Sequence, residues 1–341
     1  MNSLKLSIVD QSPVHDGKTQ AEALQDTVKL AKMADQLGYK RYWVAEHHAT
    51  ASYASPCPEI VIGQIAAATE NIKVGSGGVM LTHYSPYKVA EVFRTLEAFF
   101  PGRIDLGFGR GPGGSALPTQ ALAYPKAPCD VELYPELVQM LAGFIDGQQP
   151  HGHPFEALPV TPQGGSAPEL WTLGSSSGSI DFAAHFGLGF VLALFIGTHE
   201  RPSSIIENYR AQFRARHKSN MQQSAAIIAS AVICADSKEE AELLAASHTY
   251  WKVMSFRHGV REGIRQPEQC MDLYQRLSLS DQAYFDETRN SMVTGTPVQC
   301  RDQLEQQARY YGVDEVMIVA VTHSFEKRAQ SYQKLAAVFA D

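Results

Sequence analysis

A carboxylate and two histidines stand together at Glu46-His47-His48, directly after the predicted strand 41–45. In barrels of parallel strands, the carboxyl ends of the strands face the active site, so these side chains are predicted to lie there. Imidazoles and carboxylates exchange protons near neutral pH, which indicates general acid–base chemistry. The alternative, that one histidine packs in the core and the other is solvated, stays open. No His-Glu-x-x-His spacing or evident third ligand is present, so no metal site is expected.

A cation and a serine-rich turn form a second candidate site. Arg110 follows the predicted strand 103–108, and the predicted strand 170–173 leads into Gly174, Ser175, Ser176 and Ser179. A guanidinium, several hydroxyls and the free N–H groups of a helix start are suited to bind one phosphate. An exposed arginine and a serine that only caps a helix are the plainer interpretations. Residues 109–114 also match Gly-x-Gly-x-x-Gly, but no helix is expected to begin there, so the match is weak.

Consecutive glycines follow the predicted strand 72–76. Gly77 and Gly78 would let a flat ligand approach the backbone, or let the backbone adopt an unusual conformation. A simple turn is the alternative. The apolar residues that come next, Val79 and Met80, favour the wall of a pocket over a surface turn.

The serine-rich turn also matches Gly-x-Ser-x-Gly, with Ser176 at its centre. In serine hydrolases this pattern places the nucleophile on a strand-to-helix turn. Asp236 or Asp314 could then act as the acid and His323 as the base. No His-Gly-Gly-Gly segment for an oxyanion hole is evident upstream, and the Glu46-His47-His48 and Arg110 features would have no role. A serine hydrolase is therefore the alternative function.

Apolar runs alternate with amphipathic stretches along the chain, as expected for an α/β fold with a parallel sheet. One helix is predicted to begin at Thr19 with a capping box to Glu22 and to end at Gly38. Another is predicted to begin at Ser237. Further helices are expected at 86–100, 132–145, 200–217 and 324–340. Eight strands are expected, at 4–10, 41–45, 72–76, 103–108, 170–173, 188–194, 226–234 and 314–320.

Eight strand–helix units favour a closed (β/α)8 barrel of the TIM type over an open sheet. We expect residues 1–341 to form one domain with a mostly helical insertion at about 257–312. Long loops are expected at 110–130 and 146–168, and the first of these is a candidate lid over the active site.

The bulk composition is that of a globular protein with free thiols. Of 341 residues, 44% are hydrophobic and 19% charged, and the net charge of −7 argues against nucleic acid or anionic membranes as partners. The five cysteines form no Cys-x-x-Cys pair, which is typical of a reducing compartment. No signal peptide or membrane span is recognised, so a cytoplasmic protein is expected.

Taken together, these segments resemble the bacterial luciferase-like flavin-dependent oxidoreductases, in particular the luciferase-like monooxygenases. The resemblance spans nearly the whole chain and keeps the order of the motifs. The motifs that carry it are Tyr42 to His48, Gly75 to Pro86, Gly102 to Gly107, Leu173 to Ser176, and Asp314 to Met317.

The resemblance implies a flavin mononucleotide (FMN) at the mouth of the barrel. Arg110, Ser175, Ser176 and Ser179 match positions that hold its phosphate, and Gly77-Gly78 matches a cis peptide under its ring. His47 matches the histidine needed for oxygen chemistry, with Glu46 expected to orient it, and Ser12, beside Pro13, matches a rim position.

The resemblance further implies reduced FMN from a separate flavin reductase, O2 and a small organic molecule as substrates, and a homodimer formed through the helices after strands two and three. Some relatives use a deazaflavin, and a flavin-binding protein without catalysis is a third possibility. Gly109 stands where luciferase has a reactive cysteine, and Ser175 replaces a carboxylate of its phosphate site, so light emission is not predicted.

Overall fold

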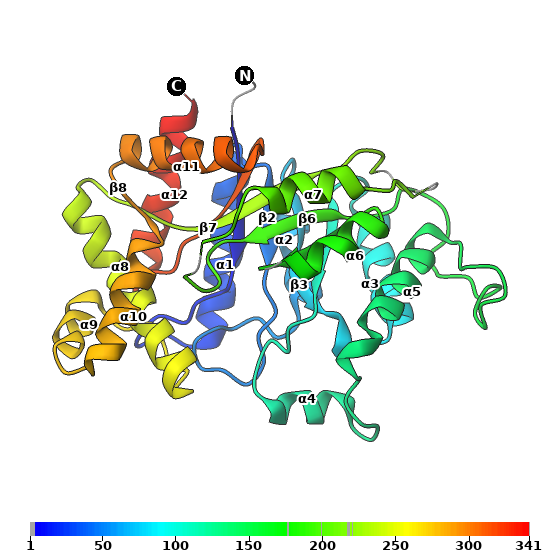
Figure 1. Ribbon diagram of the computed structural model, residues 1–341, viewed down its shortest axis with the longest axis horizontal. Helices are drawn as coiled ribbons and strands as arrows, with labels where there is room; N and C mark the ends of the chain where they lie inside the picture. Colours follow the sequence, from blue (N-terminus) through cyan, green and yellow to red (C-terminus); the bar gives the residue numbers. More distant parts are fainter. Residues whose placement is uncertain (1–3, 176, 199, 217–218, 220, 341) are drawn as a thin grey trace.

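Eight parallel strands close into a barrel (Figure 1). The computed structural model describes residues 4–175, 177–198, 200–216, 219 and 221–340. Each barrel strand pairs with the next, β9 lies between β7 and β1, and β6 pairs with β7 to close the ring. The barrel strands are β1 (Lys5–Asp10), β2 (Arg41–Val44), β3 (Lys73–Met80), β4 (Ile104–Gly109), β5 (Glu169–Gly174), β6 (Gly189–Ala193), β7 (Ala226–Cys234) and β9 (Glu315–Val319). The predicted TIM-type (β/α)8 fold is confirmed.

Helices surround the barrel and connect its strands. They are α1 (Gln20–Gln36), α2 (Pro58–Ala68), α3 (Pro86–Phe99), α4 (Ala116–Ala123), α5 (Tyr134–Asp146), α6 (Ile180–His185), α7 (Ser204–Gln212), α8 (Lys238–Lys252), α9 (Pro267–Tyr274), α10 (Leu279–Asn290), α11 (Pro297–Tyr311) and α12 (Phe325–Ala340). The capping box predicted between Thr19 and Glu22 is present at the start of α1. None of the described helices is long and apolar enough to cross a membrane.

Short helical turns complete the connections, and one of them is a π-helical turn. They are η1 (Leu81–His83), η2 (Val131–Leu133), η3 (Ser177–Ser179) and the π-helical η4 (Val253–Arg257), which continues α8. Isolated π-helical turns occur frequently at functional sites, which makes the end of α8 a candidate part of the active site.

Two predicted segments differ in detail from the structure. The glycine run does not form a turn: β3 continues through Gly77 and Gly78 to Met80, with an irregular register between Ser76 and Val79. The segment 257–312 contains α9, α10 and α11, but also a short strand, β8 (Val293–Gly295), that pairs with the end of β7. Figure 1 shows α9 and α10 beside α8 on one side of the barrel.

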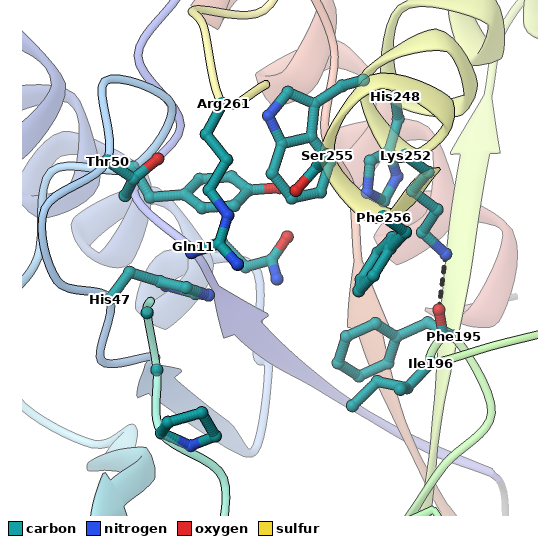
Figure 2. Close-up of a pocket in the computed structure, with 15 residues that line it drawn as sticks. Gln11, His47, Thr50, Phe195, Ile196, His248, Lys252, Ser255, Phe256 and Arg261 are labelled. Atoms are coloured by element: carbon teal, nitrogen blue, oxygen red, sulfur yellow. Dashed lines mark hydrogen bonds between the residues drawn. The ribbon is translucent and has the colours of Figure 1, made fainter. Parts of the chain in front are cut away.

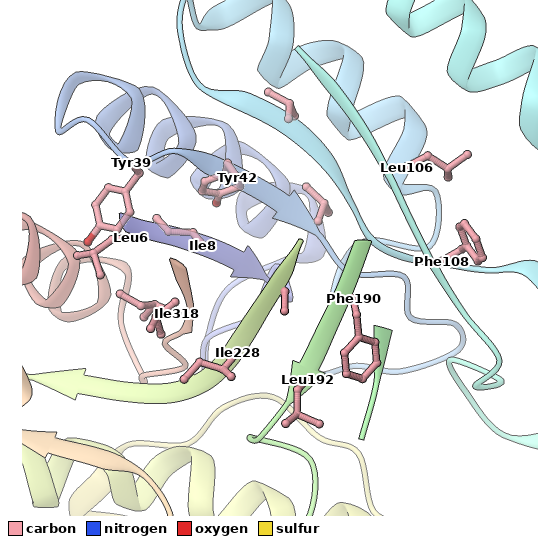
Figure 3. Close-up of a cluster of buried hydrophobic side chains, with 14 of the residues drawn as sticks. Leu6, Ile8, Tyr39, Tyr42, Leu106, Phe108, Phe190, Leu192, Ile228 and Ile318 are labelled. Carbon is pink, nitrogen blue, oxygen red and sulfur yellow. The ribbon is translucent and has the colours of Figure 1, made fainter. Parts of the chain in front are cut away.

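The strands are buried on both faces, and alternate side chains therefore belong to two different cores. Side chains such as Ile8, Tyr42 and Phe190 pack between the strands and the surrounding helices (Figure 3). Their neighbours in sequence belong to a second cluster, which includes Val9, Trp43, Trp171, Val191, Ile227 and Met317. The second cluster fills the barrel interior, so the barrel is a packed core and not a pore.

A buried charge network closes the amino end of the barrel. Arg41, at the start of β2, donates to Asp105 Oδ2 at 2.7 Å and to Glu315 Oε1 at 3.0 Å. Trp43 Nε1 donates to the same Asp105 oxygen at 2.9 Å. Asp105 alternates with the apolar Ile104 and Leu106 along β4, and its buried side chain faces the barrel interior. The network lies at the amino ends of the strands, whereas active sites of such barrels lie at the carboxyl ends. We therefore infer that the network stabilises the fold and takes no part in catalysis.

Candidate active site

A cavity of about 360 Å³ opens at the carboxyl ends of the strands (Figure 2). Its wall combines segments that follow β1, β2, β4 and β6 with the end of α8, which lie far apart in the sequence. The described residues that line it are Gln11, His47, Thr50, Tyr53, Pro112, Gly113, Gly114, Phe195, Ile196, His248, Trp251, Lys252, Ser255, Phe256 and Arg261. A concave, largely apolar pocket at this end of a barrel is the expected place for an active site.

His47 is the one predicted acid–base residue that reaches this cavity. Its ring packs against the Tyr53 ring, with 4.6 Å between centroids, and its Nδ1 is buried without a hydrogen-bond partner. Burial, followed by the positive charge of Arg261, lowers the pKa of His47 from 6.5 to about 4. His47 is therefore neutral at neutral pH, and its unpartnered Nδ1 can accept a proton.

Glu46 does not orient His47, and that expectation is wrong. The Glu46 carboxylate turns away from the cavity and accepts from His48 Nε2 at 2.7 Å, the Tyr84 hydroxyl at 2.8 Å and the Met80 backbone N–H at 3.0 Å. Glu46 and His48 are both buried. This network fixes the ends of β2 and β3 relative to each other, so Glu46 acts on the shape of the site and not on the proton of His47.

The backbone positions the two histidines on opposite sides of the same segment. The His47 N–H donates to the Ser55 carbonyl, and the His48 N–H donates to the Gly113 carbonyl, each at 2.9 Å. The second bond ties the loop after β4 to the loop after β2. Residues Pro112 to Gly114 thereby become part of the cavity wall.

The opposite wall comes from α8 and the π-helical η4, and sequence reasoning missed it. Trp251 Nε1 donates to Ser52 Oγ at 2.7 Å, which joins α8 to the loop after β2. Lys252 is buried and donates to the Phe195 carbonyl at 2.5 Å. Burial, with the nearby charge of Arg201, lowers the pKa of Lys252 to about 8. The signal that could have indicated this wall is His248-x-x-Trp251-Lys252, polar and aromatic residues near the end of an otherwise apolar helix face.

Four residues predicted to bind the cofactor do not line the cavity, namely Gly77, Gly78, Val79 and Ser12. The Gly77–Gly78 peptide is cis, as expected. A Cβ on Gly78 would lie 2.8 Å from the Gly107 carbonyl oxygen, so only glycine fits there. Val79 packs into the outer core instead of a pocket. Ser12 is buried, and its hydroxyl accepts from Thr27 Oγ1 at 2.9 Å; the neighbouring Gln11 lines the cavity in its place.

Arg110 and the serine-rich turn follow adjacent, paired strands. Phe108 pairs with Thr172, so Arg110 and Gly174 stand at the same level of β4 and β5. Arg110 is exposed and has no ion pair or hydrogen bond to another described residue. A Cβ on Gly174 would lie 2.3 Å from Ser179 Oγ, so the Ser179 hydroxyl packs directly against the strand end. The structure therefore places these groups at one rim, while Ser176 lies outside the described residues.

Arg201 links this rim to the cavity. Its Nε donates to the Ser175 carbonyl at 2.8 Å, and its Nη2 donates to the Ile196 carbonyl. Ile196 lines the cavity, so one buried arginine holds the turn after β5 and the cavity wall after β6 in a fixed relation. A ligand that extends from the cavity to the serine-rich turn would therefore contact two segments that Arg201 holds at a fixed distance from each other.

The residues proposed for a serine hydrolase do not come together. Asp314 forms an ion pair with Lys5 at 3.2 Å at the amino end of the barrel, opposite to the serine-rich turn. Asp236 forms an ion pair with Lys334 at 2.5 Å and is largely exposed. The Nδ1 of His323 is buried without a hydrogen-bond partner. The acid–base pair that this alternative requires is absent from the described residues.

Comparison with known proteins gives a consistent answer over nearly the full chain. A family model described as luciferase-like monooxygenase matches residues 4–315. The N-acetyl-S-alkylcysteine monooxygenase of Bacillus subtilis (strain 168) is 37% identical over 334 residues, which cover 98% of this chain and 97% of that protein. The crystal structure of apo-MsnO8 superposes with a TM-score of 0.86 and 37% identity, covering 99% of this chain and 98% of that one.

More distant structures share the fold alone. The oxygenating constituent of 3,6-diketocamphane monooxygenase from Pseudomonas putida, solved in complex with FMN, has a TM-score of 0.70 at 17% identity and covers 98% of this chain and 97% of that one. An F420-dependent secondary alcohol dehydrogenase has a TM-score of 0.70 at 13% identity, and the match covers 99% of this chain and 100% of that one. Of these two neighbours, one is thus described with FMN and the other with F420.

Proposed function

The chain belongs to the luciferase-like monooxygenase family, and we propose that it is a two-component monooxygenase that uses reduced FMN and O2 to oxygenate a small organic substrate. The observation that carries this proposal is the cavity at the strand ends, where a neutral histidine faces an otherwise largely apolar wall. The B. subtilis relative, a monooxygenase by name, supports the reaction class.

The residues present fit an FMN. Gln11 Oε1 and His47 Nδ1 are buried polar atoms of the cavity wall without partners, which suits the polar edge of a flavin ring. Arg110 is a cation without a counter-charge at the adjoining rim, which suits the FMN phosphate. In this arrangement Arg110, Ser175, Ser176 and Ser179 would hold the phosphate, and Gly77, Gly78 and Met80 would lie near the ring.

The chain's own residues would perform three tasks in the reaction. When bound, the reduced flavin would supply the electrons that activate O2. His47 Nδ1 would accept a proton, because burial keeps this imidazole neutral at neutral pH. The aromatic rings of Tyr53 and Trp251, 4.9 Å apart between centroids, would exclude water from the reacting centre. Glu46 would hold the ends of β2 and β3 in place through its three hydrogen bonds.

Reducing power is expected to come from a separate flavin reductase, because the chain contains no convincing nicotinamide fingerprint. A homodimer through α2 and α3 remains part of the proposal. Ile60 on α2 and Phe99 on α3 support it, with 65% and 73% of their surfaces exposed.

The test is to add FMN, or separately F420, to the purified chain and follow cofactor binding by fluorescence. Reduced FMN from a flavin reductase is then supplied with a panel of small organic substrates under ¹⁸O2, and the products are analysed by mass spectrometry. Binding of FMN and one labelled oxygen atom in a product are expected. Binding of F420 but not FMN would replace the monooxygenase proposal with a deazaflavin-dependent oxidoreductase. If FMN binds but no product contains labelled oxygen, the protein would be a flavin-binding protein without this activity.

A further inference from the structure

The charged side chains that the structure describes in the cavity wall are all basic. Arg261 and Lys252 are basic, the two histidines are His47 and His248, and no described residue that lines the cavity is an aspartate or glutamate. The whole chain, by contrast, has a net charge of −7. A cavity with local cations in an acidic protein favours an anionic occupant.

Arg261 is the cation that is available to such an occupant. Its side chain reaches over the cavity toward Gln11 and His47 (Figure 2). It has no ion pair or hydrogen bond to another described residue, so its guanidinium donors are free to bind a ligand. Lys252 is different, because its ammonium group already donates to the Phe195 carbonyl.

The opposite part of the cavity is apolar. Phe195, Ile196 and Phe256 lie together there, away from Arg261 (Figure 2). Ile196 is 44% exposed and Phe256 61% exposed, and both line the same cavity as Phe195, so they form a contiguous apolar surface that a ligand could cover. A molecule that occupies the part of the cavity beside the flavin would thus meet a cation at one end and an apolar surface at the other.

We propose that the substrate is a carboxylate with an apolar tail, and that Arg261 binds the carboxylate while Phe195, Ile196 and Phe256 contact the tail. A planar guanidinium matches a carboxylate through two parallel hydrogen bonds, which also fixes the direction in which the substrate enters. This inference rests on the proposed function, since it takes the cavity to be the substrate side of the flavin site. Arg261 is a specificity residue that lies within a segment expected to be only an insertion.

The test compares two probes of equal size, 4-phenylbutanoate and its uncharged analogue 4-phenylbutanamide. Calorimetry measures their binding to the full chain without flavin, so the result stands apart from any oxygenation. The wild-type protein is expected to prefer the carboxylate by about tenfold or more, as for a charge-assisted pair. Arg261→Met should abolish that preference, and Arg261→Lys should keep part of it.

Arg265→Met is the matched control. Arg265 lies four positions further along the same segment, outside the cavity, and pairs with the exposed Glu262. This variant should bind both probes as the wild type does. Arg261→Met removes no internal hydrogen bond of a described residue, so it is expected to fold, and a thermal melt checks this.

Three results would overturn the proposal. The wild-type chain could bind neither probe, or both equally. Arg261→Met could keep the carboxylate preference, which would place the anion elsewhere. If that variant also weakened FMN binding, Arg261 would belong to the cofactor site. None of these depends on turnover, so a failure of the monooxygenase proposal would be recognised separately from its product analysis.

Discussion

The neutrality of His47 can be tested through the pH dependence of stability, without knowledge of the substrate. Its pKa is about 4 in the folded chain and 6.5 when unfolded. Between these values the unfolded chain binds a proton that the folded chain does not, so stability is complete above pH 6.5 and falls as the pH is lowered. One such group changes the unfolding free energy by about 1.4 kcal/mol per pH unit.

Over the window from 6.5 to about 4, this amounts to at most about 3 kcal/mol, because part of the ring faces the open cavity. Burial also lowers the pKa of His15 and His248, so the wild-type slope includes their contributions. His47→Leu keeps an apolar group against Tyr53 and removes only the His47 contribution. For this variant, the unfolding free energy should change less steeply with pH than it does for the wild type. The difference corresponds to at most one proton taken up on unfolding.

The assay is urea unfolding followed by tryptophan fluorescence at a series of pH values from 7.5 to 4.5. The control is Tyr53→Phe, which changes the ring packed against His47 but removes no hydrogen bond and no group that titrates between pH 4.5 and 7.5. That variant should keep the wild-type slope. Equal slopes for the wild type and His47→Leu would refute the reasoning, because His47 would then bind its proton equally well in the folded and the unfolded chain, and burial would not lower its pKa.

Two further predictions concern single charges. Arg110→Ala should weaken FMN binding by about 2 kcal/mol, the loss of a charge-assisted pair, in a fluorescence titration; unchanged affinity would remove Arg110 from the site. Arg328→Met leaves the buried carboxylate of Asp10 without its ion-pair partner. It should therefore lower the free energy of unfolding by about 3–5 kcal/mol in urea, and a loss below about 1 kcal/mol would show that this pair does not stabilise the fold.

The sequence by itself determined the elements and their order. Segments rich in apolar residues identified all eight barrel strands to within a few residues, because parallel strands buried on both faces are mostly apolar. The capping box at Thr19 and the serine at Ser237 marked two helix starts, since capping is a contact within one turn. Parallel order alone then placed His47 and Arg110 at the carboxyl ends of strands.

The tertiary structure decided which of those residues share a site. Sequence spacing could not tell which histidine Glu46 would bind, because the segment after β2 is irregular and its side-chain directions depend on the loops packed against it. Nor could it tell that Arg261 and Trp251 line the same cavity as His47. Trp251 meets Ser52 across 199 positions, a contact that exists only because the barrel brings the ends of β2 and α8 together. Local patterns fix local structure, whereas a cavity wall consists of contacts between distant segments, and only the closed barrel determines those.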